Sequence, residues 1–262
     1  MYALKLGQSL VSSNRIGVAN DFVFEINNFG TTNVVVEWGD GTKDTITSYN
    51  AAETLHTYST NGNFIVKMRG DYSLRESGSI DSLKMVNIEK WGGFVFKQSA
   101  ALFQTTTTCT ATDVAKVTST NMSLTLKGNF NFNGVLNELD VSNVTNFQSF
   151  FFGNSVFNQP LNSWNTSSAT RMDSMFRNAV GFDQDISSWD ITSVTNLSNF
   201  MTGATLSTVN YDALLIAWEA QAPSTGVTVD FGSSKYSIGS NAEVARNELI
   251  ITYGWTITDG GG

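Results

Sequence analysis

Apolar and polar positions alternate with a period of two through residues 20–70. Successive residues of a strand point to opposite faces of a sheet, so this alternation predicts strands that are buried on one side. Residues 39–42 read Gly-Asp-Gly-Thr next to such a run, which favours a hairpin because glycine accepts positive φ. The segment therefore predicts a small antiparallel β-sandwich. Its apolar runs are Phe22, Phe24 and Ile26; Val34, Val36 and Trp38; and Phe64, Val66 and Met68.

A repeat of 25 residues dominates the second half of the chain. Segments that begin at Leu139, Trp164 and Trp189 align with one another at that spacing. A coil of this length cannot enclose a core of its own, so equivalent apolar residues must stack on those of the next coil. The repeat therefore predicts a stack of coils joined by three apolar columns: Phe150, Met175 and Phe200; Phe151, Phe176 and Met201; and Phe157 with Phe182.

Each repeat is expected to contain two short elements. An extended piece is predicted around Val141, Thr166 and Ile191, which are equivalent positions of the three repeats. A helix-like piece is predicted in residues 172–176, where apolar residues recur at spacings of three and one. Residues 88–113 contain a weaker version of the repeat, which we interpret as the N-terminal end of the same array.

The residues that follow the repeats predict a cap. Residues 211–220 and 243–251 each show the spacing of a helix with one buried face. Between them, Val227, Val229 and Phe231 alternate as in a strand. An uncovered last coil would expose its apolar side, and a cap buries it. The side chains expected inside are Leu214, Leu215 and Trp218 of the first helix, and Ala245 and Leu249 of the second.

Three motifs in the first segment resemble a PKD-type immunoglobulin-like domain. They are Trp38-Gly39-Asp40-Gly41, then His56-Thr57-Tyr58, then Gly62-Asn63-Phe64-Ile65-Val66. The resemblance implies an immunoglobulin-like β-sandwich in residues 1–75. Such modules are mostly spacers or adhesion units.

Residues 80–262 resemble the BspA-like leucine-rich-repeat surface proteins, whose repeat recurs in mycoplasma-type lipoproteins. The resemblance is carried by residues 157–161, 172–176 and 182–196 of the repeats, and by residues 211–218 and 254–261 of the tail. It implies a leucine-rich-repeat-like solenoid with a C-terminal cap. The expected parts are an N-terminal region at 80–138, the 25-residue repeats at 139–205 and the cap at 206–262.

The first residues of the chain bear on where the protein acts. Residues 2–10, Tyr-Ala-Leu-Lys-Leu-Gly-Gln-Ser-Leu, resemble the start of some tailed-phage virion proteins. Residues 1–17 contain no long apolar run followed by a cleavage site, so no signal peptide is expected in the chain as given. These two observations favour release within a particle over secretion.

Composition and charge exclude several classes of function. The chain has 262 residues and a net charge of −8, which would repel a phosphate backbone, so nucleic-acid binding is not expected. A single cysteine, Cys109, excludes an intrachain disulfide. Together with the single histidine, His56, it cannot form a Cys/His zinc site. No stretch approaches the roughly 18 apolar residues that a membrane span needs, so membrane insertion is not expected.

Carboxylates offer the best candidate chemistry, because a glycosidase needs two of them. Asp183, Asp185 and Asp190 lie close together in the sequence, but Asn158 and Pro160 replace the first two in the preceding coil. No acidic column forms, and these residues are expected to be ordinary repeat residues. Calcium binding at residues 183–190 or at Asp40 stays an open alternative, since acidic loops supply oxygen ligands.

Three further candidates are expected to be structural. His56 is predicted to lie beside Tyr58, the place that the PKD resemblance gives it. Cys109 follows a run of threonines away from any cluster of cations, so a small buried apolar role is expected. In the triplet at 150–152, the 25-residue register places the first two phenylalanines in the core and predicts that Phe152 is exposed.

The sequence thus predicts an α+β chain without catalytic, cofactor-binding or metal-binding residues. The function we expect is that of a non-enzymatic phage virion surface protein, such as a head fibre, a decoration protein or a tail-associated adhesin. Its partners would be other virion proteins and a host-surface glycan or protein, bound by multiple copies of the chain. The alternatives are a bacterial cell-surface adhesin of the BspA-like type and a polysaccharide-degrading tailspike.

Overall fold

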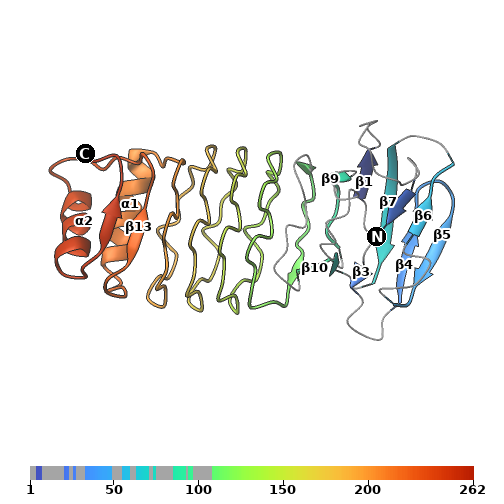
Figure 1. Ribbon diagram of the computed structural model, residues 1–262, viewed down its shortest axis with the longest axis horizontal. Helices are drawn as coiled ribbons and strands as arrows, with labels where there is room; N and C mark the ends of the chain where they lie inside the picture. Colours follow the sequence, from blue (N-terminus) through green and yellow to red (C-terminus); the bar gives the residue numbers. More distant parts are fainter. Residues whose placement is uncertain are drawn as a thin grey trace.

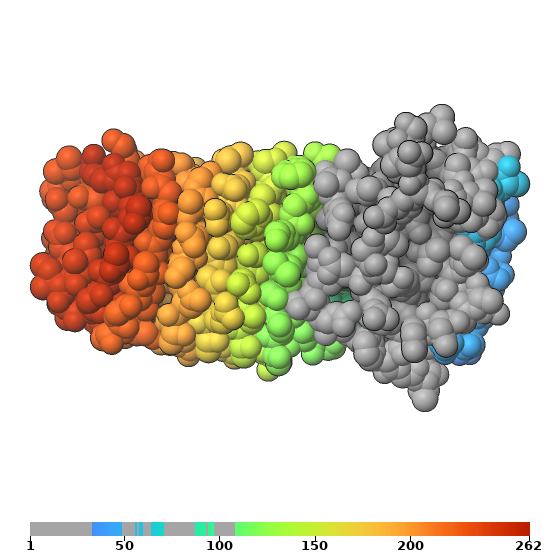
Figure 2. All heavy atoms as spheres, viewed as in Figure 1, coloured from blue at the N-terminus to red at the C-terminus, as the bar shows by residue number. Residues whose placement is uncertain are grey.

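The computed structural model describes residues 4–7, 21–23, 26–27, 33–48, 55–59, 63–70, 73–74, 85–92, 94–96 and 108–262. The fold is mixed α and β. Most strands gather at one end, a stack of coils forms the middle, and the two helices lie at the other end with β13 (Figure 1). In the space-filling view, the coils and the cap form one continuous elongated body (Figure 2).

The described strands form a six-stranded sheet in the order β11-β9-β1-β7-β4-β5, and four pairs, β10-β12, β13-β14, β2-β6 and β3-β8. These elements establish small sheets, and the immunoglobulin-like sandwich itself stays a prediction. The strands are β1 (Leu4–Gly7), β2 (Asp21–Val23), β3 (Ile26–Asn27), β4 (Val34–Glu37), β5 (Lys43–Ile46), β6 (Leu55–Thr57), β7 (Asn63–Arg69), β8 (Ser73–Leu74), β9 (Met85–Ile88), β10 (Val95–Phe96), β11 (Thr108–Cys109), β12 (Lys116–Val117), β13 (Thr228–Asp230) and β14 (Thr256–Thr258). The helices are α1 (Thr208–Glu219) and α2 (Asn241–Ile251).

The predicted hairpin is confirmed between β4 and β5, where Glu37 pairs with Lys43 and the N–H of Trp38 donates to the carbonyl of Thr42 at 3.1 Å. Residue 39 must be a glycine, because its φ is 85° and a Cβ there would lie 2.7 Å from the carbonyl oxygen of Ile65. The side chains of Val34, Val36 and Trp38 are buried, as the alternation predicts.

One sheet crosses the predicted domain break at 75–80. β1 pairs with β7 on one side and with β9 on the other, so that Leu4 lies opposite both Val66 and Ile88. β9 in turn pairs in parallel with β11, which begins the coils. The first segment and the coils therefore share backbone hydrogen bonds across this predicted boundary. Most of the polar stretch 70–79 lies outside the described residues.

The coils are joined by backbone hydrogen bonds between equivalent segments. The N–H groups of residues 122, 124 and 126 donate to the carbonyls of residues 146, 148 and 150 at 2.8–3.0 Å. The same pattern links residues 147–153 to 171–177, and residues 172–178 to 196–202. In each coil, every second N–H group of this segment thus donates to a carbonyl of the next coil rather than to one of its own coil.

This bonding corrects both local predictions for the repeat. Residues 172–176 form turns rather than a helix-like piece, because Ser149, Ser174 and Asn199 each have φ of 55–57°. A left-handed residue in every coil breaks an α-helix and directs the backbone N–H groups toward the neighbouring coil. The predicted extended piece is also a turn, since the N–H of Val144 donates to the carbonyl of Val141 at 2.8 Å.

The apolar columns are confirmed, since every member of the three predicted columns is buried. The rings of Phe157 and Phe182 stack with centroids 6.1 Å apart and an interplanar angle of 8°, and those of Trp164 and Trp189 stack at 6.0 Å and 5°. One hydrophobic cluster extends from Val34 to Trp255, so the N-terminal sheet, the coils and the cap share a core.

The cap packs on the last coil in the way that a further coil would. The indole N–H groups of Trp164 and Trp189 donate to the carbonyls of Leu136 and Leu161, and Trp218 of α1 continues this column by donating to Ile186 at 3.4 Å. Both predicted helices and the strand between them are confirmed, with the predicted residues buried. Among the described residues, neither helix is long and apolar enough to cross a membrane.

An ion pair closes the cap. The guanidinium of Arg246 on α2 donates to both carboxylate oxygens of Asp259, at 2.6 and 3.2 Å, and the hydroxyl of Tyr211 on α1 donates to the same carboxylate at 2.8 Å. Burial by itself would raise the pKa of Asp259, but these hydrogen bonds and one from the N–H of Gly261 hold that pKa below its usual value. The three side chains tie both helices to the end of β14.

Candidate binding surface

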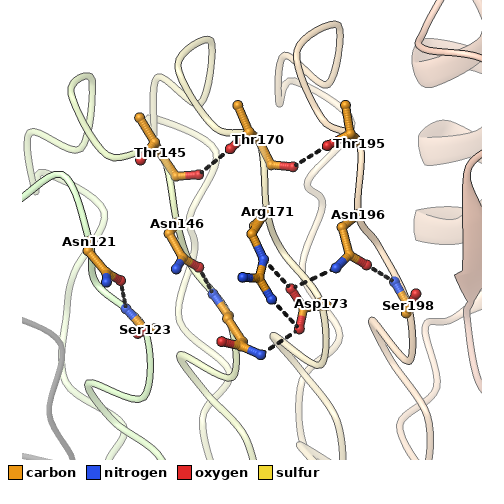
Figure 3. A network of polar contacts seen from close by, with 11 residues as sticks. Asn121, Ser123, Thr145, Asn146, Thr170, Arg171, Asp173, Thr195, Asn196 and Ser198 are labelled. Carbon is orange, nitrogen blue, oxygen red and sulfur yellow. Dashed lines mark hydrogen bonds and ion pairs between the residues drawn. The ribbon is translucent and has the colours of Figure 1, made fainter.

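Two columns of polar residues run along one side of the coils, and we call them the ladder face. One column is Thr120, Thr145, Thr170 and Thr195, and beside it runs the column Asn121, Asn146, Arg171 and Asn196. Figure 3 shows these residues except Thr120. The second column forms successive parallel bridges from one coil to the next. The repeat therefore places chemically similar side chains in straight rows.

The threonine column holds the coils together through its hydroxyls. Thr145 donates its hydroxyl hydrogen to the carbonyl of Thr120 at 3.0 Å. Thr170 donates to Thr145 in the same way at 3.2 Å (Figure 3). Thr195 donates to Thr170 at 3.3 Å. These hydroxyls therefore have a structural partner within the protein.

Two asparagines of the second column have amide donors that the described residues do not use. The side-chain oxygen of Asn121 accepts from the N–H of Ser123 at 3.0 Å, and that of Asn146 accepts from the N–H of Gln148 at 2.9 Å. These bonds fix both amide planes. The NH₂ groups of Asn121 and Asn146 have no hydrogen-bond partner among the described residues, and both side chains reach the surface. They are pre-oriented donors.

Arg171 interrupts the asparagine column, and its positive charge is neutralised by a carboxylate of the protein. Its guanidinium contacts the carboxylate of Asp173 at 3.1 and 3.4 Å. The same carboxylate accepts from Gln148 at 2.8 Å and from Asn196 at 3.2 Å (Figure 3). The carboxylate of Asp173 is 12% exposed and the arginine 44%, so the pair neutralises itself and presents little net charge.

Phe152 is only half-buried, but it does not present an open ring. The ammonium of Lys127 lies 5.3 Å from its centroid and the guanidinium carbon of Arg177 lies 5.6 Å from it. Lys127, Phe152 and Arg177 occupy equivalent positions in three successive coils. The predicted register is confirmed at Phe152, and the prediction of a freely exposed phenylalanine is wrong, because cations of the neighbouring coils cover it.

The acidic candidates each have a local partner. The carboxylate of Asp183 accepts from the N–H of Ser207 and from the amide of Asn210, both at 2.8 Å, at the start of α1. Asp185 accepts from the N–H of Ser187, and Asp190 from Thr192. Among the described residues, no group of three His, Cys, Asp or Glu side chains is placed to hold a metal ion. The three carboxylates stabilise turns and the junction with the cap.

His56 lies beside Tyr58, as predicted. Its ring stacks on Trp38 at a centroid distance of 4.5 Å, meets Tyr58 edge-on at 4.5 Å, and contacts the carboxylate of Asp40 through Nε2 at 2.8 Å. Burial works against the charge of Asp40, but hydrogen bonds from Thr42 and His56 lower its pKa overall. Both oxygens of Asp40 are engaged, one by Thr42 and the other by His56.

Cys109 is half-buried against the core. Burial raises the pKa of its thiol to about 11. A Cβ on Gly134, the equivalent residue of the next coil, would lie 2.6 Å from the Cys109 sulfur, so the two coils touch there. Both observations agree with the predicted packing role.

Residues 93–214 match the family described as a Mycoplasma protein of unknown function, DUF285. The match covers a little under half of the chain, and it contains the coils and the beginning of α1. It agrees loosely with the resemblance to BspA-like surface repeats. The curated proteins and the solved structures gave no match.

The asparagine column and Lys127 were missed by the sequence analysis, although the signal was available. Extending the 25-residue register back by one coil from Asn146 reaches Asn121, and from Phe152 it reaches Lys127. The weaker apolar pattern before residue 139 hid this coil.

Proposed function

We propose that this chain is a non-enzymatic adhesion module of a cell surface, which binds a polar partner through the ladder face. The observation that carries the proposal is the pair of fixed amide donors at Asn121 and Asn146, spaced by one coil on a rigid scaffold. Donors held in place lose little entropy when a ligand binds, which favours hydrogen bonding to sugars or to a polar protein.

The match to a Mycoplasma family supports the cell-surface alternative better than the virion reading. The virion reading depends on residues 2–10, of which the structure describes residues 4–7. The tailspike alternative needs two cooperating carboxylates. Asp183, Asp185 and Asp190 each accept hydrogen bonds from their own turns or the cap, which supports a structural role for them.

Affinity in this proposal comes from many copies. A hydrogen bond to a neutral donor contributes about 0.5–1.5 kcal/mol net, so two donors alone give weak binding. When copies are clustered on one surface, binding of the first copy raises the effective concentration of the others at the partner. Many weak contacts then together hold the two surfaces stably attached.

The test compares the chain as a monomer and as a coat on beads, with binding to a panel of bacterial and animal cells measured by flow cytometry. The N121D/N146D variant keeps both side-chain acceptors and removes both free donors. We expect coated beads to attach, monomer to bind weakly, and variant-coated beads to lose attachment while the melting temperature stays close to that of the parent chain. Attachment that is unchanged in the variant, or release of sugars from the cells, would overturn the proposal.

A further inference from the structure

A second surface on the coils carries net positive charge, although the chain as a whole is acidic. We define the basic strip as Lys127, Phe152 and Arg177. Among the described residues, neither Lys127 nor Arg177 has a carboxylate partner, whereas Arg171 is neutralised by Asp173. The strip therefore presents two cations without a carboxylate partner, one at 5.3 Å and one at 5.6 Å from the centroid of the same aromatic ring.

The charges of the coils are segregated by register. When the coils are aligned by multiples of 25 residues, Lys127, Arg171 and Arg177 fall at positions 171–177 together with one carboxylate, Asp173, which pairs with Arg171. Five other carboxylates fall at positions 183–190. Charges on the protein surface are screened beyond about 8 Å at physiological salt, so an anion near the strip responds to these two cations rather than to the net charge. The five carboxylates are Glu138, Asp140, Asp183, Asp185 and Asp190.

The ring of Phe152 holds both cations in place. A cation over an aromatic face is attracted by the electron-rich ring. A long side chain that is already ordered loses less entropy when it binds an anion. Arg177 also offers a planar fork that fits a carboxylate or sulfate through two hydrogen bonds.

An open aromatic surface adjoins the strip. Phe130 is 47% exposed, and the atom Cε1 of its ring lies 3.7 Å from the Cβ position of Gly153, the residue after Phe152. A Cβ on Gly128 would meet nothing within 4 Å, so the backbone beside Lys127 is open. An exposed aromatic ring suits the apolar C–H face of a sugar, because the face of the ring is electron-rich.

We infer that Lys127, Phe152, Arg177 and Phe130 form a binding site for an anionic polysaccharide. The inference rests on the proposed function, since it names the class of polar partner. The cations would bind the carboxylate or sulfate groups of successive sugars, and Phe130 would pack against a sugar ring. The equal offset of Lys127 and Arg177 from Phe152, one coil each, matches a polymer with a regularly repeated charge better than a compact anion.

The experiment measures binding of the full chain by calorimetry to three probes: polygalacturonate, dextran sulfate and neutral dextran. We expect the polyanions to bind and neutral dextran not to bind. Binding to polygalacturonate alone identifies the ligand group as a carboxylate, and binding to dextran sulfate alone identifies it as a sulfate. The absence of binding to both polyanions would overturn the inference.

Matched variants locate the site. K127Q/R177Q should weaken polyanion binding about tenfold, because each exposed ion pair contributes up to about 1 kcal/mol and 1.4 kcal/mol corresponds to a factor of ten. K235Q removes an exposed lysine of the cap and should leave the affinity unchanged. Equal loss in K235Q would mean that binding follows total charge, and it would refute the site.

Phe130 separates a polysaccharide from an acidic peptide. F130A should weaken binding to the preferred polysaccharide and leave any weak binding to poly-glutamate unchanged. Poly-glutamate binding as tight as that of the polysaccharide, with no effect of F130A, would identify an acidic peptide site and overturn the inference. Failure here, together with bead attachment that N121D/N146D abolishes, would leave the proposed function standing.

Discussion

Phe176→Ala tests whether the 25-residue register describes the core. The side chain is fully buried, stacks on Phe182 at 4.0 Å and 16° and on Phe151 at 5.3 Å and 8°, and meets Phe200 edge-on at 5.5 Å. Truncation of a buried phenylalanine costs about 3–5 kcal/mol. Since each aromatic pair adds about 0.5–1.5 kcal/mol beyond burial, we expect a value near the upper end of that range.

The control is Phe152→Ala, which removes the same ring from the outside of the neighbouring coil. Phe152 is half-buried and has two cation contacts of about 0.5–1 kcal/mol each, so its loss should cost about 1–2 kcal/mol. The contrast between the two variants therefore depends on the inward and outward positions that the register assigns.

The assay is urea unfolding followed by tryptophan fluorescence, with amide hydrogen exchange in parallel. A stack of coils can open in parts, so exchange shows whether the loss of stability is local. In F176A, the amides that bridge to the next coil, such as that of Phe176 to the carbonyl of Phe200, should lose protection first. A free energy of unfolding that falls no further in F176A than in F152A would refute the register.

Three other predictions follow from the cap, the thiol and the sheet. The pKa of Asp259 is lowered in the folded chain, so its contribution is complete above its ordinary pKa of 3.8 and is lost as the pH falls through the lower folded value. D259N should cost about 3 kcal/mol at pH 7 and progressively less as the pH falls below 3.8, measured by thermal unfolding. Alkylation of Cys109 followed by mass spectrometry should be slow at pH 8 and accelerate toward pH 11, and rapid labelling at pH 8 would contradict its raised pKa. Limited proteolysis should cut first within residues 70–79. The two fragments should still elute together in size-exclusion chromatography, because β1 of the first fragment pairs with β9 of the second as well as with β7. Separate elution would argue against that pairing.

The apolar columns could be predicted from the sequence, and the local backbone could not. A spacing of 25 residues survives any change in local conformation, so residues such as Phe151 and Phe176 could be paired without knowledge of the turns between them. The spacing of Met172, Met175 and Phe176 fits a helix and also fits successive three-residue turns. The positive φ of Ser174 makes the segment a series of turns, and a serine in the sequence gives no strong signal for positive φ.

Pairing between distant segments was also beyond the sequence. β5 was implied only by the hairpin signal before it and shows no apolar alternation of its own, because only Ile46 of its four residues is buried. The contact of β1 with β9 joins residues 4–7 to residues 85–88, and no turn signal marks so long a connection. The polar site residues could be reached only through the register, since the role of Asn121 depends on its place in a column rather than on its neighbours in the chain.

The central claim is that the ladder face makes the contact with the partner, and the most direct measurement is hydroxyl-radical footprinting of bead-borne protein on and off the cells that it binds. The account predicts protection of residues 120–121 and 145–146 in the attached protein, with the carboxylate turns at 183–190 labelled equally in both states. Protection confined to 183–190, or to the cap, would contradict it.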